Sequence, residues 1–519
     1  MKTKQLFFCS LTGLALLTTS CSSNDEALNG GDGTTSEGKT YAQIAISVAN
    51  SATTRALTGN TGEYEYGDDA EYTVNDLTVV LANENDIAMQ VITPELKEAT
   101  NTDVGDDKLI RVTKPFKCTP GSYKVYVLAN YNNSKSSLSP IIKGSTDMNT
   151  VFGLSDIAKL STTNNFFMTN VSAPTAQEIK KKATDKEVDD AGNEATGGET
   201  NLNLLKVDVE RAVSKVTFNQ DKLSFDVKEG GNKIATATLE GVSLINLNKK
   251  MYLVKHGELA MNKPVAGDWP YPMDPNYDLT SIDEAYITAN FEQTSASVFS
   301  APSEAKFYCP ENTMAALAQL NGQTTGVVYK VKYTPVDDFY TTLAAANGTD
   351  SYSQMFEKVL ALGEVKDAAI TNTIFTTAEG TDITDGTFYS YNGYVFKSKA
   401  GARLYKAIAT NTDGEAATVN TAFKNNKNDA DIQTYTEGDC YYTAWIKHNP
   451  TSTVTMEQDK YGVVRNFWYE LTVDNIKKLG YSQPTYKDPK DPDDKEEASI
   501  QVQVNIKKWR VVKQNLDLE

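Results

Sequence analysis

The chain has 519 residues, of which 40% are hydrophobic, and a formal net charge of −18. This length allows roughly three domains, and the hydrophobic content is typical of globular proteins and not of disordered ones. The acidic balance argues against a nucleic-acid partner, because binding phosphates requires a basic face.

The N-terminus predicts export. Residues 1–20 place Lys2 and Lys4 before the apolar stretch LFFCSLTGLALL, which is too short to span a bilayer as a helix. Cys21 follows small residues and precedes a Gly/Ser/Thr-rich tether over 22–40. This arrangement resembles a bacterial lipoprotein signal with Cys21 as the acylated residue, although Thr18 stands where such signals carry leucine. The alternative is ordinary secretion with cleavage nearby.

Most of the remaining chain predicts β-strands. Residues 42–48 alternate, which puts Ala42, Ile44, Ile46 and Val48 on one face of a half-buried strand. The same alternation recurs further on, at Leu77, Val79, Leu81, Val125, Val127, Leu205, Val207 and Val209. Helical patterns are expected only over 147–160, 353–363 and 474–480. We therefore predict an all-β protein of sandwich type, with a domain boundary near residue 207.

The C-terminus predicts a long strand behind a linker. Residues 482–497 are rich in Pro, Asp and Lys, and we interpret them as a solvated linker. Residues 498–519 then carry apolar side chains in alternation, with one shift of phase, at Ile500, Val502, Val504, Ile506, Trp509, Val511, Leu516 and Leu518. Such a strand requires a pairing partner. The partner is either this chain itself or a neighbouring molecule.

The sequence offers no candidate for catalysis or metal binding. His256 and His448 stand in unlike contexts without metal-ligand spacing, and we expect both in surface loops. Cys118, Cys309 and Cys440 form no motif and predict buried free thiols. No phosphate-binding loop or hydrolase motif occurs. We therefore expect no cofactor, no metal and no enzymatic activity.

Several segments resemble the type V pilin family of Bacteroidales, and in particular the shaft fimbrilin of the short fimbriae. LKVDVERAVSKVTF resembles the junction between the two domains of that family, and KFYCPENT with GVVYKVKYTP resembles a central strand pair. GDCYYTAWIKHNP, GVVRNFWYELTVDNIKKLG and IKKWRVVKQNLDLE resemble its last strands. The family fold, two transthyretin-like β-sandwiches in tandem, agrees with the all-β prediction.

The resemblance implies a division of the chain and an assembly route. The divisions are a signal peptide (1–20), a propeptide with tether and removable strand (21–55), two sandwich domains (56–207 and 208–481), a linker (482–497) and a donor strand (498–519). An arginine-specific protease would cut between Arg55 and Ala56 and release the strand at 42–48. The C-terminal strand of a neighbour would then enter the vacated groove by donor-strand exchange.

The implied location and partners follow from this route. The precursor would be held at the outer membrane by its lipid, and the mature subunit would lie in an extracellular fimbrium that serves adhesion and biofilm formation. Its partners would be other copies of itself, anchor and tip subunits, and host or bacterial surface receptors. The alternatives are a tip or accessory adhesin of the same fimbria and a surface glycan-binding lipoprotein. For Arg55 the alternative is a solvated loop residue.

Overall fold

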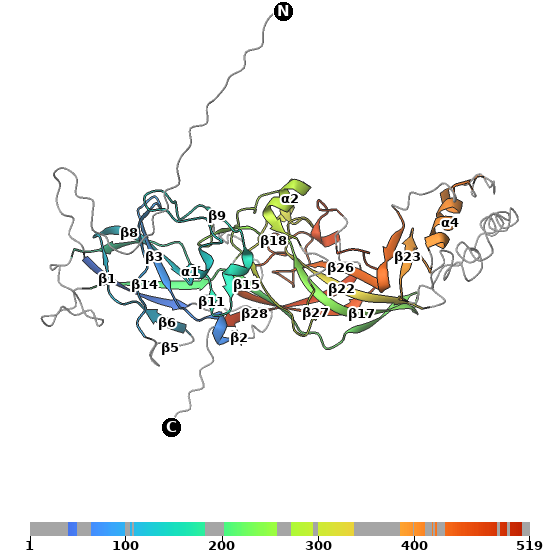
Figure 1. Ribbon diagram of the computed structural model, residues 1–519, viewed down its shortest axis with the longest axis horizontal. Coiled ribbons are helices and arrows are strands. Elements are labelled where there is room, and N and C mark those ends of the chain that lie inside the picture. The colour runs from blue at the N-terminus through green and yellow to red at the C-terminus, as the bar shows by residue number, and fades with distance from the viewer. Residues whose placement is uncertain are drawn as a thin grey trace, which may run out of the picture.

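A computed structural model shows two β-rich halves arranged end to end along the long axis (Figure 1). The N-terminal half runs from blue to cyan and the C-terminal half from green to red. The structure describes residues 40–48, 64–98, 104–105, 108–181, 202–256, 271–293, 299–336, 385–397, 399–410, 418, 421–422, 431–484, 488–495 and 499–510. The all-β prediction is confirmed.

The N-terminal half contains one hydrogen-bonded path of strands in the order β4-β3-β8-β12-β14-β1-β6-β5, with β13 beside β8 and β7 beside β1. The strands of this path are β1 (Thr40–Val48), β3 (Leu77–Ala82), β4 (Ala88–Ile92), β5 (Val104–Gly105), β6 (Lys108–Val112), β7 (Phe116–Cys118), β8 (Gly121–Ala129), β12 (Met168–Asn170), β13 (Ala176–Ile179) and β14 (Leu202–Arg211). They surround one apolar core, to which β1, β3, β8 and β14 contribute. All six residues of β3 are buried, so both faces of that strand are covered.

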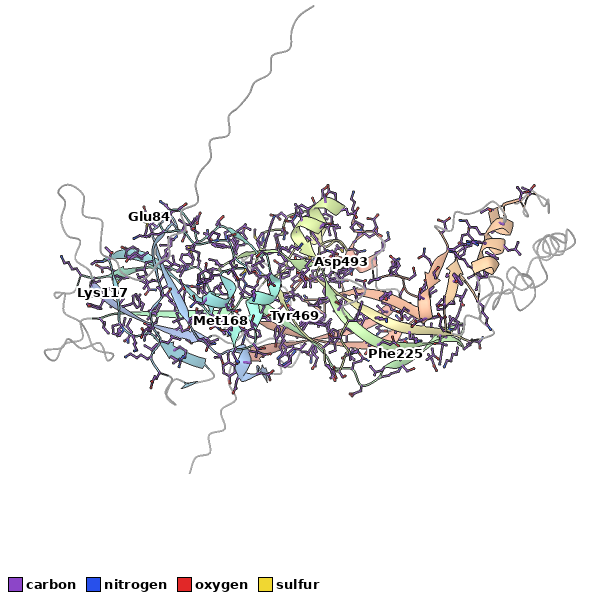
Figure 2. The ribbon with its side chains drawn as sticks, viewed as in Figure 1. Glu84, Lys117, Met168, Phe225, Tyr469 and Asp493 are labelled. Carbon is purple, nitrogen blue, oxygen red and sulfur yellow. The ribbon has the colours of Figure 1, made fainter. Side chains whose placement is uncertain are left out.

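The C-terminal half is a two-sheet sandwich. One sheet has the order β2-β28-β27-β15-β21 and the other the order β16-β17-β22-β26. The strands of the two sheets are β2 (Tyr64–Tyr66), β15 (Val213–Phe218), β16 (Ser224–Glu229), β17 (Asn232–Ile245), β21 (Lys306–Pro310), β22 (Gly326–Pro335), β26 (Asp439–Trp445), β27 (Phe467–Ile476) and β28 (Ile500–Arg510). The inward side chains form a second core that includes Val216, Tyr329, Tyr469 and Ile506. Figure 2 shows Phe225 and Tyr469 in this half and Met168 in the other.

Shorter elements fill the connections. The small strands are β9 (Val151–Gly153), β10 (Ser161–Thr162), β11 (Asn165–Phe166), β18 (Leu247–Asn248), β19 (Lys250–Tyr252), β20 (Phe291–Glu292), β23 (Phe388–Tyr391), β24 (Tyr394–Phe396) and β25 (Gln433–Tyr435). The helices are α1 (Tyr131–Ser134), α2 (Glu284–Asn290), α4 (Lys399–Thr410) and the 3-10 turns η1 (Asp69–Glu71), η3 (Ile157–Leu160), η4 (Ala316–Ala318), η8 (Thr436–Gly438) and η9 (Asp493–Lys495). No helix among the described residues has both the length and the apolar character needed to cross a membrane.

Two of the three expected helices are wrong. Residues 147–160 form β9 and the 3-10 turn η3, and residues 474–480 complete β27 and then turn. In both cases strand pairing overrides a weak local helical pattern. The third segment, 353–363, lies outside the described residues.

The chain passes from one half to the other at Ala212. β14 ends at Arg211 in the N-terminal sheet, and β15 begins at Val213 in the C-terminal sandwich. The boundary expected near residue 207 falls inside β14, so the passage comes later in the chain. A second connection between the halves is the antiparallel pair of β9 with β19.

Candidate functional site

The first candidate feature is β1, which lies inside the N-terminal sheet. It pairs in parallel with β14, from Tyr41 opposite Leu202 to Val48 opposite Val209. On its other side it pairs antiparallel with β7 near its start and with β6 near its end. β1 therefore lies between β14 on one edge and β6 with β7 on the other, and it joins these strands into one sheet.

The side chains of β1 are more deeply buried than the sequence predicts. Ala42, Ile44, Ile46 and Val48 are each 0% exposed, which confirms that they share an inward face. On the opposite face Tyr41 and Gln43 are also buried, so the expected half-buried strand is buried on both faces over its first part. On that face the Lys117 ammonium lies over the Tyr41 ring, and the Gln43 amide donates to the Thr113 carbonyl oxygen.

Polar contacts fix the register of β1. The Gln43 amide donates to the Thr113 carbonyl oxygen at 2.9 Å. The Ile44 N–H donates to Thr113 Oγ1 at 3.1 Å, and the Thr113 N–H donates to the Ile44 carbonyl oxygen at 3.0 Å. The Asn203 amide donates to the Tyr41 carbonyl oxygen at 3.0 Å. A strand that entered this position in place of β1 would meet the same backbone partners on both sides.

The second candidate feature is β28, which lies in the C-terminal sandwich of its own chain. It pairs antiparallel with β27, from Ile500 opposite Ile476 to Lys508 opposite Phe467. The short strand β2 pairs with its far end, from Lys508 to Arg510. In this structure the C-terminal strand is thus paired within its own chain.

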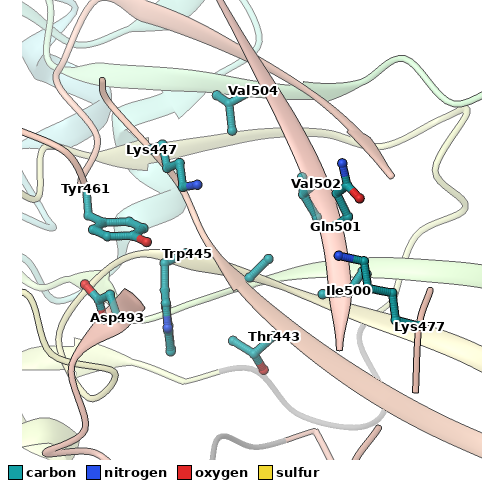
Figure 3. Close-up of a pocket in the computed structure, with 11 residues that line it drawn as sticks. Thr443, Trp445, Lys447, Tyr461, Lys477, Asp493, Ile500, Gln501, Val502 and Val504 are labelled. Atoms are coloured by element: carbon teal, nitrogen blue, oxygen red, sulfur yellow. The ribbon is translucent and has the colours of Figure 1, made fainter. Parts of the chain in front are cut away.

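β28 is less completely packed against its neighbours than β1. Ile500 and Ile506 are buried in the C-terminal core, but Val502 and Val504 are only half-buried. A cavity of about 350 Å³ lies beside the strand and is lined by Ile500, Gln501, Val502, Val504 and residues of β26 and nearby loops. Figure 3 shows β28 on one side of this cavity and Trp445, Tyr461 and Asp493 on the other. Unfilled volume next to apolar side chains weakens their packing.

The segment that precedes β28 corrects one prediction. Residues 488–495 were expected to be solvated, but the buried Asp493 accepts a hydrogen bond from Thr324 Oγ1 at 2.5 Å. Lys460 Nζ forms an ion pair with Asp494 at 2.5 Å, and the Gly322 N–H donates to the Pro489 carbonyl oxygen. Burial raises the pKa of Asp493 well above its usual value. This acidic strap, residues 488–495, therefore fixes the base of β28 to the C-terminal sandwich.

A buried cluster of charges joins the two halves, and the sequence interpretation missed it. Lys215 Nζ lies 2.9 Å from Glu71 Oε1, and both side chains are almost fully buried. The Arg211 guanidinium donates to the Glu71 carbonyl oxygen and to Asn466 Oδ1, at 2.9 and 2.8 Å. Burial lowers the pKa of Arg211 to about 10. One signal was available: Arg211 continues the inward phase of Leu205, Val207 and Val209.

The histidines and cysteines that the structure describes form no cluster suited to catalysis or metal binding. His448 was expected at the surface, but it is fully buried, and its Nδ1 lies 2.7 Å from the Tyr469 hydroxyl. Cys118, Cys309 and Cys440 are buried and free, as predicted, and burial raises the pKa of each thiol to about 12. Such thiols are poor nucleophiles. Among the described residues no cluster of His, Cys, Asp or Glu could hold a metal ion.

Several predicted site residues cannot be placed. Cys21, Arg55, Ala56, Val511, Leu516 and Leu518 lie outside the described residues. Trp509 lies within β28, and only its backbone is described. The remaining predicted residues fall into two separate places, β1 in the N-terminal half and β28 in the C-terminal half.

Two segments of the chain match models of known protein families. Residues 42–211 match the major fimbrial subunit protein (FimA), and residues 433–515 match the C-terminal part of fimbrillin, the type IV major fimbrial subunit protein. The first match begins in β1 and ends with β14, and the second contains β26, β27 and β28. Both models describe fimbrial subunits, so over these two segments the chain resembles subunits of a fimbrium. Fimbrial subunits act at the cell surface, in a fimbrium.

A search of solved structures also finds matches, all of low sequence identity. A Porphyromonas gingivalis fimbrilin is 13% identical, with 91% of this chain and 99% of that chain covered and a TM-score of 0.38. A Parabacteroides distasonis protein, described provisionally as a cell adhesion protein, is 14% identical, with 91% and 100% covered and a TM-score of 0.40. The tip fimbrial protein Mfa3 of Porphyromonas gingivalis is 12% identical, with 90% and 100% covered and a TM-score of 0.30.

No curated protein matches the chain. The likeness to fimbrial subunits rests on the two segment matches and not on the solved structures.

Proposed function

We propose that this protein is the shaft subunit of a surface fimbrium and polymerises by donor-strand exchange. β1 would leave the N-terminal sheet after cleavage between Arg55 and Ala56, and the C-terminal strand of a neighbour would take its place. The observation that carries this proposal is the position of β1, a strand with four fully buried inward side chains and a partner on each edge. Its removal would leave a groove that only another strand can fill.

The C-terminal strand has the pattern that this groove requires. β1 presents Ala, Ile, Ile and Val at alternate positions, and β28 presents Ile, Val, Val and Ile at the same spacing, from Ile500 to Ile506. Both sets are aliphatic, so either can fill a dry groove. Four such side chains contribute roughly 6–12 kcal/mol on full burial, at about 1.5–3 kcal/mol each. The backbone ladder adds about 1 kcal/mol for each hydrogen bond.

The burial of β28 within its own chain determines how much free energy is lost when the strand moves to a neighbouring subunit. Val502 and Val504 gain burial if they enter a neighbour's groove, whereas Ile500 and Ile506 exchange one core for another. The part of the strand that leaves could therefore be its whole length or its far end, including Trp509, Val511, Leu516 and Leu518. In either case donor and groove lie in different halves of the subunit. The contact is then heterologous and produces an open filament.

The earlier steps of the route complete the proposal. Acylation at Cys21 would hold the precursor at the outer membrane, and an arginine-specific protease would release the lipid and β1 together. Anchor and tip subunits would end the filament, and surface receptors would bind it. We propose no enzymatic role and no cofactor.

The home pairing of β28 favours one alternative, a tip or accessory subunit that keeps this strand. A glycan-binding lipoprotein would also keep it and would not need cleavage at Arg55. Because a tip subunit still needs an open groove, cleavage alone does not separate it from a shaft subunit. Polymer growth does.

The decisive experiment uses the precursor without its signal segment. An arginine-specific protease is added, and the new N-terminus and the size distribution are followed over time. The matched controls are Arg55→Ala, which blocks cleavage, and two truncations, after residue 510 and after residue 497. A new start at Ala56 with a growing ladder, absent for Arg55→Ala, supports the shaft subunit, and the two truncations show which part of the strand is donated. Cleavage without a ladder contradicts the shaft role and favours the tip subunit.

A further inference from the structure

We propose that β2 is a clamp that holds the C-terminal strand at home until the propeptide is cut. The inference rests on the donor-strand exchange proposed above and adds a regulatory step to it. A single cut would then open the groove and loosen the donor in the same molecule.

The clamp acts where β28 has no other partner. β27 pairs with β28 only as far as Lys508, which lies opposite Phe467. Among the described residues, Trp509 and Arg510 pair only with β2, opposite Glu65 and Tyr66. Figure 1 shows β2 beside β28 near the middle of the molecule. A strand that leaves from its free end must break this contact first.

The downstream end of β2 is fixed to the domain junction. Two residues after β2, Asp68 forms an ion pair with Lys306 at 2.5 Å. Glu71 then places its carboxylate 2.9 Å from Lys215 Nζ, in the buried cluster between the halves. The Asp68 N–H donates to Glu71 Oε2 at 3.0 Å, which holds the turn η1 closed. These contacts anchor one side of the clamp whether or not the chain is cut.

The upstream end of β2 is connected through the chain to β1. Chain connectivity puts residues 49–63 between β1 and β2, and Arg55 lies within them. While the chain is intact, β1 in the N-terminal sheet holds one end of this connection and η1 holds the other side of β2. A three-residue strand is marginal by itself, so its pairing depends on these fixed ends. Cleavage after Arg55 frees the upstream end, and the strand then opens more often.

This arrangement explains why uncut subunits would not donate prematurely. An uncut subunit has a filled groove and a clamped donor, so it neither accepts nor supplies a strand. Cleavage allows β1 to leave the groove and also releases the clamp on the donor strand. Without the clamp, an uncut lipoprotein could cap a growing filament and stop it, because its own groove is closed to the next subunit.

The first test measures amide hydrogen exchange in β28 before and after cleavage of the precursor. We expect roughly tenfold faster exchange at residues 508–510 after cleavage, with a smaller change over 500–506, because only the far end loses its β2 partner. Equal exchange at 508–510 in the cut and uncut chains would overturn the clamp. This test does not require strand exchange to occur.

The second test measures donation by uncut chains. Filament seeds are assembled from cut protein, and labelled Arg55→Ala chains, whose grooves stay filled, are added as donors. Glu65→Pro and Tyr66→Pro are compared in that background. Adjacent N–H groups of a strand point to opposite edges, so one proline removes an N–H that faces β28 and the other serves as its matched control.

We expect one of the two proline variants to cap the seeds about tenfold faster than its parent, with the other close to the parent. Equal rates for both variants and the parent would overturn the clamp while leaving strand exchange intact. If cut protein forms no seeds at all, the proposed function fails first, so the two failures are distinguishable. Unchanged amide exchange over β1 in each variant confirms that the N-terminal half is folded.

Discussion

β1 and β28 have the same alternating pattern, but the protein holds them very differently. β1 has a partner on each edge along its length, and its four inward side chains are fully buried. β28 has β27 on one edge, β2 at one end only, and a cavity beside two of its valines. Pattern alone therefore does not tell how strongly a strand is held. What matters is how many neighbours complete its surroundings.

The contrast gives the direction of the proposed exchange. A strand whose apolar side chains are only partly packed gains the most burial when it moves into a groove that encloses them. The groove occupied by β1 is enclosed in this way. In the proposed route the cut between Arg55 and Ala56 separates β1 from β2, and the buried strand can then leave the sheet.

The largest expected effect comes from trimming β1. Ile44→Ala in the uncut chain removes buried methyl groups from a site with no exposure and should cost about 2–5 kcal/mol of the free energy of unfolding of the N-terminal half. Denaturant unfolding of the Arg55→Ala chain with and without the substitution measures this cost. Lys206→Ala, at an exposed position of the neighbouring β14, is a matched control. A loss below about 0.5 kcal/mol, typical of surface positions, would contradict the buried seat of β1.

The next effect concerns the junction that connects the two strands' domains. Lys215→Met removes the nearer of the two lysines paired with the buried Glu71 carboxylate and should cost about 3 kcal/mol at most. Lys306, at 3.9 Å, and the hydrogen bonds from the Tyr308 hydroxyl and the Asp68 N–H compensate that charge only in part. The double variant Glu71→Met with Lys215→Met should recover most of that loss. Thermal unfolding of the single and double variants checks both. A double variant no more stable than the single would show that the pair is not the source of the cost.

Two buried carboxyl groups of the C-terminal half, Asp493 in the acidic strap and Asp274 outside it, should make the stability of that half depend on pH. Burial raises the pKa of Asp493 well above its usual value and that of Asp274 to about 8. Because these folded-state pKa values lie above the unfolded value, the native state binds more protons, and stability falls as the pH rises from about 4 toward 8. Each such group contributes up to about 1.4 kcal/mol per pH unit while the folded and unfolded states differ by one proton.

Asp493→Asn tests this dependence. The amide is neutral at every pH and preserves the shape of the side chain, so stability of the C-terminal half should fall less between pH 5 and 8 in the variant. Unfolding midpoints at a series of pH values measure the slope. The N-terminal unfolding step of the same protein is the internal control. An unchanged slope in the C-terminal step would mean that Asp493 is ionised in the folded protein.

The comparison also shows what the sequence could predict. Alternation found β1, β14 and β28 and the inward faces of Ile44 and Ile506, because a strand's period is local. It could not find that Tyr41 and Gln43 on the opposite face are also buried, since their partners Lys117 and Thr113 come from distant parts of the chain. The boundary predicted near residue 207 lies before the passage at Ala212, because buried side chains continue from β14 through Ala212 into the first residues of β15.

Composition was the weaker guide where charged residues are buried. The acidic strap has the composition of a solvated linker, yet Asp493 meets Thr324 from a loop far earlier in the chain. His448 likewise depends on Tyr469, which local context does not reveal. The Arg55 site, the lipid on Cys21 and the donor role of 498–519 remain predictions. The two family matches indicate a fimbrial subunit. The difference in packing between β1 and β28 gives a physical reason for the proposed exchange of strands between subunits.

The smallest effect on the subunit should be the most informative for the filament. Val504→Ala removes two methyl groups at a half-buried position beside the cavity, so it should cost the free subunit about 1 kcal/mol or less. If the whole strand is donated, the same side chain becomes fully buried in the neighbour's groove, and its loss should destabilise the filament by more than it destabilises the subunit. Denaturant midpoints of the subunit and of the assembled filament give the two costs, with Gln503→Ala, on the solvent face of β28, as control. Equal losses of stability in the subunit and in the filament would show that this part of β28 remains paired within its own chain. Only the residues beyond it would then be exchanged.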